Sequence, residues 1–273
     1  MKKNFLWARL KSRLQLVNNQ RSCSYHWLFL PGGPGLGSES LSELTQILQL
    51  PGTMWHLDLP GDGSNITTNN SEYFSHWSVA LVEAVKAFDK VILVAHSTGG
   101  MQALATPRLE ELLAGLVLMD SAPDTSWQNI FMKYVKQHPI PKVEKLQKIY
   151  NENPNNEVLK QLIVASAPYL FTTSGLKKDI SFLEKLPINY QTCEWSAQHF
   201  DSTYKAKWIP KNIPTLILGG SEDCITPLRL FAQSPDFQRD NIFIREIKDA
   251  GHYPWIENPE QVILTFKEYC QKL

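Results

Sequence analysis

The stretch "VILVAHSTGGMQAL", residues 91–104, begins with residues typical of a buried strand and continues into residues that suit a helix. Residues 91–95 form a short apolar run of the kind found in strands that are buried on both faces. Ser97 follows this run at the junction with the helix. A serine there is either a helix cap that accepts backbone N–H bonds or a nucleophile, and the stretch alone leaves both readings open.

Five other apolar runs have the same form, and each ends in glycine, proline or a small polar residue: 26–30, 53–59, 114–120, 215–220 and 241–247. Helix-length segments with apolar residues at helical spacing lie between or after several of these runs: 71–88, 98–113 and 258–273. Alternating strands and helices need crossover connections. The sequence therefore predicts an α/β fold with a mostly parallel central sheet flanked by helices.

This alternation is interrupted once, between residues 124 and 208. The segment contains no convincing buried strand, and it consists of amphipathic stretches separated by proline, asparagine or glycine. We expect a helical cap over residues 124–208, inserted into a core made of residues 1–123 and 209–273. Its position in the chain predicts that it covers the C-terminal edge of the sheet, where open α/β sheets bind ligands.

The first 25 residues allow two interpretations. "RLQLV", residues 13–17, reads as a strand, whereas the periodicity of "FLWARLKSRL", residues 5–14, fits a helix equally well.

Composition excludes several classes of protein. The 273 residues include 27 Lys and Arg against 27 Asp and Glu, so no net charge favours nucleic acid or an anionic membrane. Arg9, Lys11 and Arg13 interrupt the apolar residues near the start, which argues against a signal peptide, and no window approaches the length of a membrane span. We expect a small-molecule ligand; the oligomeric state stays open.

The cysteines also carry information about the class of protein. Cys23, Cys193, Cys224 and Cys270 include no C-x-x-C pair, which argues against structural zinc and against a dense disulfide framework. We therefore expect reduced thiols in a cytoplasmic protein, with neither a metal nor a cofactor.

Five candidate sites follow predicted strands directly. They are "PGGPG" at 31–35, "DLPGDGSN" at 58–65, Ser97, Asp223 in "GGSEDCITP" and His252 in "DAGHYPW". The carboxyl ends of parallel strands meet at one edge of a sheet, so these five sites should converge there.

At these residues the chain resembles the α/β-hydrolase fold family, from residue 26 to the end. "AHSTG" is similar to the family's nucleophile elbow G-x-S-x-G, with Ala95 in place of the first glycine. The order Ser97, Asp223, His252 matches the family order of nucleophile, acid and histidine. The glycine loop departs from the family pattern, because Pro31 stands where a histidine is common.

The resemblance implies a role for each residue. Ser97 would attack a carbonyl after His252 removes its proton, and Asp223 would orient and stabilise the imidazole. The backbone amides of Thr98 and Gly33 would bind the oxyanion. Asp120, which ends the run "GLVLMD", is the alternative acid; the family spacing from Gly220 to Pro227 favours Asp223.

Two neighbouring residues have simpler interpretations. His96 is adjacent to the serine, but consecutive side chains point apart, so it should face into the fold. Glu222, next to Asp223, is interpreted as a solvated surface charge.

We therefore expect a serine hydrolase that cleaves a carboxylic ester, or a related acyl bond, of a small molecule. "PGGPG" and the long insertion are also similar to the proline iminopeptidase subgroup, which makes an aminoacyl substrate the second candidate. A cofactor-free lyase or oxygenase that uses His252 as its base, or a receptor without catalysis, are the remaining classes.

Overall fold

The computed structural model describes residues 5–20, 23–66 and 72–273. Within these residues one sheet contains eight strands: β1 (Phe5–Trp7), β2 (Arg13–Gln20), β3 (His26–Leu30), β4 (Gly52–Asp58), β5 (Val91–His96), β6 (Leu113–Met119), β7 (Thr215–Gly220) and β8 (Ile242–Ile247). Their order is β1-β2-β4-β3-β5-β6-β7-β8. The six strands from β3 to β8 are parallel, and β1 and β2 are antiparallel to their neighbours. The predicted α/β fold with a mostly parallel sheet is confirmed.

The start of the chain is a hairpin, so the helical interpretation of residues 5–14 is wrong. Leu6 pairs with Leu14, and the intervening turn closes with Lys11 at φ 69°. Strand β2 continues along β4, where Arg13 lies opposite Asp58. These pairs between strands decide the conformation of residues 5–14, and the spacing of apolar residues within that stretch cannot predict them.

The described residues form thirteen α-helices: α1 (Ser42–Ile47), α2 (Glu72–Ser75), α3 (Trp77–Val85), α4 (Thr98–Leu104), α5 (Ser126–Gln137), α6 (Pro141–Glu152), α7 (Asn156–Ala165), α8 (Ala167–Leu170), α9 (Phe182–Lys185), α10 (Tyr190–Ser196), α11 (Arg229–Ala232), α12 (Pro254–Glu257) and α13 (Pro259–Cys270). The helix expected over 71–88 is divided into α2 and α3, and residue 71 lies outside the described residues. The helix expected over 98–113 stops at Leu104, because Pro107 begins a separate 3-10 turn at Pro107–Glu111.

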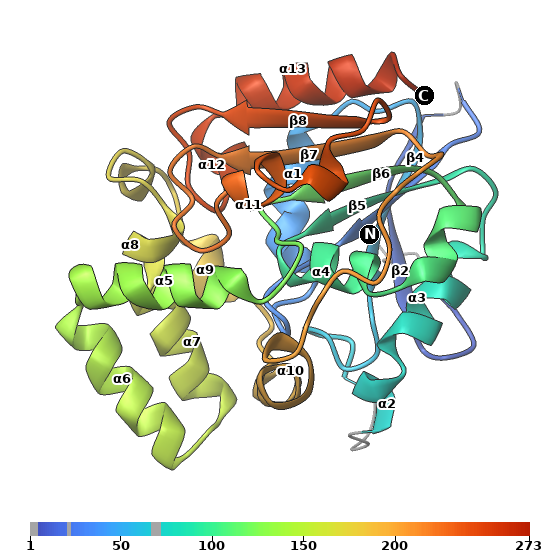
Figure 1. Ribbon diagram of the computed structural model, residues 1–273. Coiled ribbons are helices and arrows are strands. Elements are labelled where there is room, and N and C mark those ends of the chain that lie inside the picture. Colours follow the sequence, from blue (N-terminus) through green and yellow to red (C-terminus); the bar gives the residue numbers. More distant parts are fainter. Residues whose placement is uncertain (1–4, 21–22, 67–71) are drawn as a thin grey trace.

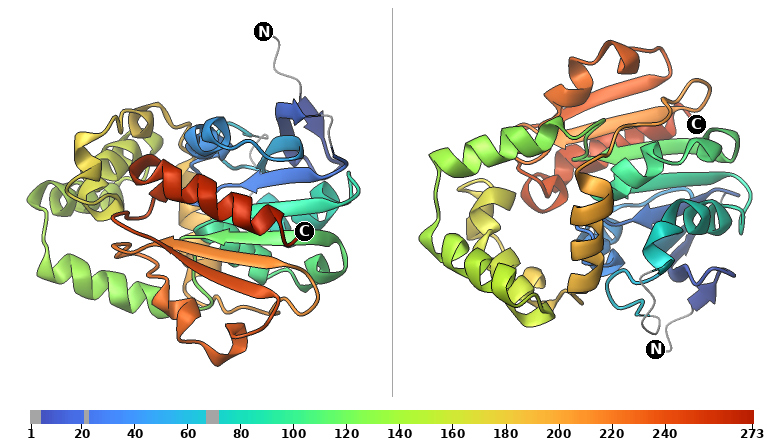
Figure 2. Two further views of the ribbon diagram at one scale, coloured as in Figure 1. Left: turned by 90° about the horizontal axis from the view of Figure 1, so that it is seen from above. Right: turned by 60° about the horizontal axis from the view of Figure 1, so that its bottom comes forward.

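The central strands β3, β5, β6 and β7 are buried on both faces, which explains their continuous apolar runs. In β5, Ile92 and Val94 face a core shared with α1 and α13, whereas Leu93 and Ala95 face a second core shared with α3 and α4. Strands covered on both faces need apolar residues at consecutive positions. Figure 2 shows α13 crossing one face of the sheet.

Helices α5 to α10 lie between β6 and β7 in the chain. Figure 1 shows α5 to α9 beyond the ends toward which the parallel strands point. Leu146, Leu159 and Leu162 of these helices belong to the same buried cluster as β3 and β5. We call residues 126–196 the inserted helices.

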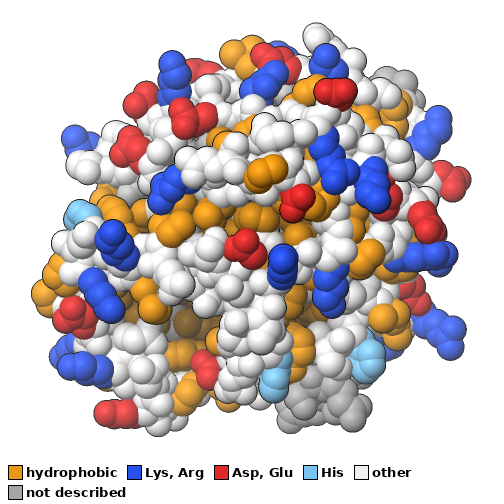
Figure 3. All heavy atoms as spheres, in the orientation of Figure 1, with side chains coloured by type: hydrophobic (Ala, Val, Ile, Leu, Met, Phe, Trp, Pro, Cys, Tyr) orange, Lys and Arg blue, Asp and Glu red, His pale blue; other side chains and the backbone are white. Residues whose placement is uncertain are grey.

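The surface is mixed in charge. On the face drawn in Figure 3, Lys and Arg side chains are interspersed with Asp and Glu. Among the described helices, none is long and apolar enough to cross a membrane.

A buried ion pair joins the hairpin to the sheet, and it gives a test of this part of the fold. Arg13 donates to Asp58 Oδ2 at 2.7 and 3.1 Å, and the Asp58 side chain is fully buried. We expect Arg13→Met to lower the free energy of unfolding by about 3–5 kcal/mol, because it leaves a buried carboxylate without its partner. The matched control is Arg108→Met, which removes an exposed pair with Glu111 and should cost less than about 1 kcal/mol. Urea unfolding of both variants measures the two changes in the free energy of unfolding. Equal changes would contradict a special role for the buried Arg13–Asp58 pair.

Candidate active site

Ser97 occupies a strained turn between β5 and α4. Its φ of 51° and ψ of −123° lie outside the regions that residues other than glycine usually adopt. The turn needs small neighbours: a Cβ added to Gly99 would collide with the Pro31 carbonyl oxygen, and one added to Gly32 would lie 2.5 Å from Ser97 Cβ. Ala95, at the position where the family has glycine, is fully buried and packs in the apolar layer shared with α3 and α4.

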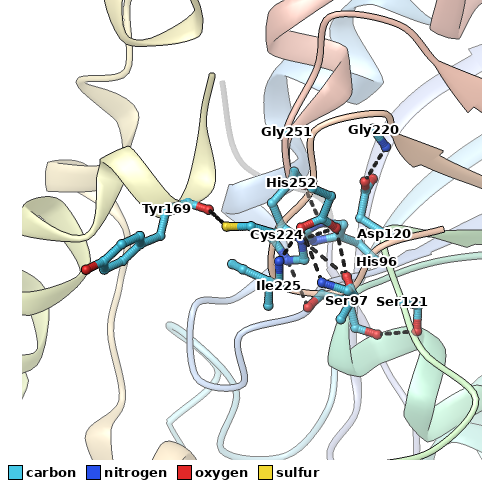
Figure 4. A network of polar contacts seen from close by, with 12 residues as sticks. His96, Ser97, Asp120, Ser121, Tyr169, Gly220, Cys224, Ile225, Gly251 and His252 are labelled. Carbon is cyan, nitrogen blue, oxygen red and sulfur yellow. Dashed lines mark hydrogen bonds and ion pairs between the residues drawn. The ribbon is translucent and has the colours of Figure 1, made fainter. Parts of the chain in front are cut away.

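Three side chains form a continuous hydrogen-bonded series at the carboxyl edge of the sheet. Ser97 Oγ lies 3.0 Å from His252 Nε2, and His252 Nδ1 lies 2.9 Å from Asp223 Oδ2. Each of the three residues is less than a tenth exposed. Figure 4 shows His252 between Ser97, after β5, and the loop of Cys224 and Ile225, after β7. The fold thus brings together residues that are up to 155 positions apart in the chain.

The environment of Asp223 favours its ionised form. Burial opposes ionisation, but the charge and hydrogen bond of His252, the Ile225 amide and the Thr226 hydroxyl together hold the pKa of Asp223 below its ordinary value. Asp223 can therefore carry the negative charge that faces the imidazole.

Asp120, at the end of β6, has a different environment. One carboxyl oxygen accepts the Gly220 amide at 2.8 Å, and the other is buried without a hydrogen-bond partner among the described residues. Burial, and then the nearby Asp223 carboxylate, raise the pKa of Asp120 well above its ordinary value. The imidazole of His252 pairs with Asp223 and not with Asp120, and the raised pKa of Asp120 favours its uncharged form.

The same residues bear on metal binding. Ligand atoms of Asp120, Asp223 and His252 lie within 4.8 Å of one another. However, both ring nitrogens of His252 already have protein partners, Asp223 and Ser97. A metal ion there would have to displace one of these hydrogen bonds.

His96 points away from the serine hydroxyl. Its Nε2 lies 3.0 Å from the backbone oxygen of His252, and its ring contacts that of Trp255 edge to face at 4.9 Å. Burial, followed by the proximity of His252, lowers the pKa of His96 to about 3. His96 is therefore neutral, and it donates its Nε2 proton to the backbone oxygen of His252. We call residues 248–253, between β8 and α12, the histidine loop.

The glycine loop at 31–35 lies against the serine turn. A Cβ on Gly32 would be 3.2 Å from the amide nitrogen of Thr98, and Gly33 has φ 122°, which favours glycine. Thr98 begins α4, so its amide has no carbonyl partner one turn earlier in the helix.

The glycine loop is held on both sides. The amide of Gly35 donates to the side chain of Asp62 (Oδ1) at 2.8 Å, and the carbonyl of Gly35 accepts the backbone N–H of Asn189, the residue before α10, at 3.0 Å. Burial and the neighbouring Asp58 carboxylate raise the pKa of Asp62 to about 8.

Sequence reasoning missed the side chains that support this site. Asp62 enters the sequence-based prediction only as part of a glycine-rich turn, although a carboxylate between two glycines is a local signal for amide binding. Glu257 and Thr226, which contact the loops of His252 and Asp223, carry no such signal. Glu222 is exposed.

The sheet, the strained serine turn and the histidine after the last strand define a class, that of α/β proteins with a hydrolase-type site. The chain belongs to the alpha/beta hydrolase family, whose sequence model matches residues 27–263. A Mycoplasma pneumoniae protein named "Putative esterase/lipase 2" is 24% identical over 209 residues, which cover 74% of this chain and 73% of that protein.

Solved structures share the fold across the whole chain. An alpha/beta fold family hydrolase from Bacillus anthracis has a TM-score of 0.76 at 17% identity, and the match covers 98% of this chain and 99% of that one. A proline iminopeptidase-related protein from Thermus thermophilus has a TM-score of 0.74 at 19% identity, covering 100% and 99%. A thermophilic esterase from Thermogutta terrifontis has a TM-score of 0.67 at 19% identity, covering 100% and 99%.

The raised pKa of Asp120 predicts a specific dependence of stability on pH. Because its pKa is raised in the folded protein, the folded state retains a proton that the unfolded chain releases above about pH 4. Stability is then lost as pH rises, by up to about 1.4 kcal/mol per pH unit from this group. Asp120→Asn removes the titration, so the difference in unfolding free energy, variant minus wild type, should increase between pH 5 and 8.

Urea unfolding at four pH values measures this difference. The control is Asp240→Asn, at an exposed aspartate, which should run parallel to the wild type. If the unfolding free energy of Asp120→Asn also changes with pH in parallel with that of the wild type, Asp120 is ionised in the folded protein.

Proposed function

We propose that this protein is a serine hydrolase that cleaves a carboxylic ester of a small molecule through an acyl-enzyme on Ser97. The observation that carries the proposal is the hydrogen-bonded series from Ser97 Oγ through His252 to Asp223. A serine hydroxyl is a weak nucleophile at neutral pH unless a base removes its proton, and this series supplies the base and the group that orients it.

In the proposed reaction His252 carries one proton in each of two halves, acylation and deacylation. Ser97 Oγ bonds to the ester carbonyl carbon while its proton moves to His252 Nε2. The bond from that carbon to the alcohol oxygen then breaks, and the leaving alkoxide takes the same proton. Water next attacks the acyl group and gives a proton to His252. Ser97 regains that proton as the carboxylic acid departs.

The oxyanion formed in both halves of the reaction needs hydrogen-bond donors. We assign this role to the amides of Thr98 and Gly33. The close approach of Gly32 to Ser97 and Thr98 supports the assignment, because it brings the backbone of the glycine loop next to the serine turn.

We propose that residues 124–208 act as a cap over this site and select the substrate. An ester is supported by the esterase names of relatives that share the fold. An aminoacyl substrate is the second candidate, supported by the iminopeptidase-related neighbour and the glycine loop. The four cysteines, all unpaired, favour the cytoplasm as the location.

A fluorophosphonate probe tests the nucleophile. Its phosphorus bonds to an activated serine with loss of fluoride, so the wild type should gain one adduct mass, and Ser97→Ala should gain none. Intact-mass spectrometry measures the adduct, and circular dichroism checks that the variant is folded. A folded wild type without an adduct would oppose the acyl-enzyme and favour the lyase, oxygenase or receptor classes.

The acid is tested separately on p-nitrophenyl esters. Asp223→Asn should lower kcat/KM by about two to four orders of magnitude, because the amide cannot stabilise the imidazolium or hold the correct tautomer. Asp120→Asn should stay within a few fold of the wild type at neutral pH, because Asp120 does not pair with His252 and an asparagine oxygen can still accept the Gly220 amide. The reverse pattern would move the acid to Asp120. A parallel screen of aminoacyl p-nitroanilides decides between the two substrate classes.

A further inference from the structure

Glu257, the last residue of α12, joins the histidine loop to Thr172, which lies within the inserted helices. Its Oε2 accepts the Gly251 amide at 2.6 Å, and its Oε1 accepts both the amide and the hydroxyl of Thr172, at 2.9 and 2.6 Å. The residue is buried, with 9% of its surface exposed. Gly251 directly precedes His252, so this carboxylate holds the backbone from which the imidazole projects.

The segment around Thr172 makes further contacts to the same region. The amide of His252 donates to the Leu170 carbonyl at 2.8 Å, and the Cys224 thiol donates to the Tyr169 carbonyl at 3.2 Å. Figure 4 shows Tyr169 reaching Cys224 beside His252. Residues 169–172 therefore contact both the loop that carries Asp223 and the loop that carries His252.

This junction leaves little free space. A Cβ on Gly251 would lie 2.6 Å from the Leu170 carbonyl oxygen, and a Cβ on Gly175 would collide with Glu257 Oε1. Neighbours this close leave the carboxylate a single position. A displacement of Glu257 would therefore be transmitted to the backbone at Gly251.

The two carboxyl oxygens of Glu257 both act as acceptors. Their three partners, the Gly251 amide and the amide and hydroxyl of Thr172, donate to them. A glutamine in either orientation would place its NH₂ group against the N–H of Gly251 or against that of Thr172. One backbone donor would then be buried and unpaired unless the loop moves.

We propose that Glu257 is a positioning residue for His252, and that it sets the imidazole with the help of residues 169–172. This inference rests on the proposed function, in which His252 is the base. Glu257 does not contact the substrate or Ser97; it acts through the backbone at Gly251. The inserted part of the chain would then support the catalytic histidine in addition to covering the site.

Glu257→Gln tests the proposal, because it preserves the shape of the side chain, removes its charge and replaces one acceptor oxygen with an NH₂ donor. We expect kcat for a p-nitrophenyl ester to fall about 10- to 100-fold while KM changes less than about threefold, because displacement by a fraction of an ångström misaligns the reacting atoms. Active sites are counted with the fluorophosphonate probe, so a smaller folded fraction does not lower the measured kcat.

The pH profile of kcat/KM provides a readout that stability alone would not move. Loss of a buried negative charge beside the histidine loop makes protonation of the imidazole less favourable. The acid limb of the profile should therefore move to lower pH in Glu257→Gln. The matched control is Glu260→Gln, an exposed glutamate at the start of α13, which should leave kcat and the profile unchanged.

Thr172 provides a second pair of variants. Thr172→Val removes the hydroxyl donor and should lower kcat about three- to tenfold, whereas Thr172→Ser retains the hydroxyl and should keep the wild-type kcat. If Glu257→Gln does not fold, this pair decides: equal kcat for valine and serine overturns the proposal.

The outcomes separate this inference from the proposed function. A wild type that neither reacts with the probe nor cleaves esters opposes the proposed function itself. An active wild type with Glu257→Gln unchanged in kcat and in its acid limb overturns the positioning role alone.

Discussion

The constraint on which the rest of the site depends is the backbone conformation at Ser97. A non-glycine residue in such a conformation costs roughly 1–3 kcal/mol, and it persists only where its surroundings fix it. Here both backbone groups are engaged: the amide of Ser97 donates to the Met119 carbonyl at 2.9 Å, and its carbonyl accepts the Ser121 hydroxyl at 2.8 Å. The neighbouring strand β6 thus holds the turn. The Ser97 hydroxyl projects from this fixed backbone, and its Oγ lies 3.0 Å from His252 Nε2.

The inserted helices contribute to the same framework. They share a buried apolar cluster with the sheet, Asn189, directly before α10, binds the glycine loop, and residues 169–172 bind the histidine loop. Both loops next to Ser97 are therefore supported by the inserted helices. Changes in these helices would thus be transmitted to the relative positions of Ser97 and His252.

The sequence predicted the parts of this molecule that depend on local patterns. The central strands of the parallel sheet are continuous apolar runs, and Ser97, Asp223 and His252 could be selected because each comes shortly after a predicted strand. The conformation of residues 5–14 was ambiguous because part of what decides it lies far along the chain. Arg13 of β2 pairs with Asp58 of β4, which is 45 residues away. Glu257 and Thr172 are 85 residues apart, and nothing in either neighbourhood indicates the other. Supporting contacts of this kind depend on the tertiary arrangement, so no spacing rule finds them.

Two buried carboxyls beside one imidazole raise the question of how many charges the site holds. Asp223 has two amides, a hydroxyl and the imidazole as hydrogen-bond donors, whereas Asp120 has one amide. Burial penalises each charge, and two like charges penalise each other, so the pKa of Asp120, which has fewer donors, is raised, whereas that of Asp223 is lowered. These opposite shifts favour the negative charge on Asp223, the carboxyl that faces the imidazole. A second carboxylate at Asp120 would stabilise the imidazolium of the proposed reaction further and slow the return of its proton to the leaving group. The raised pKa of Asp120 opposes that second charge, and it therefore favours a His252 that both accepts the proton and releases it.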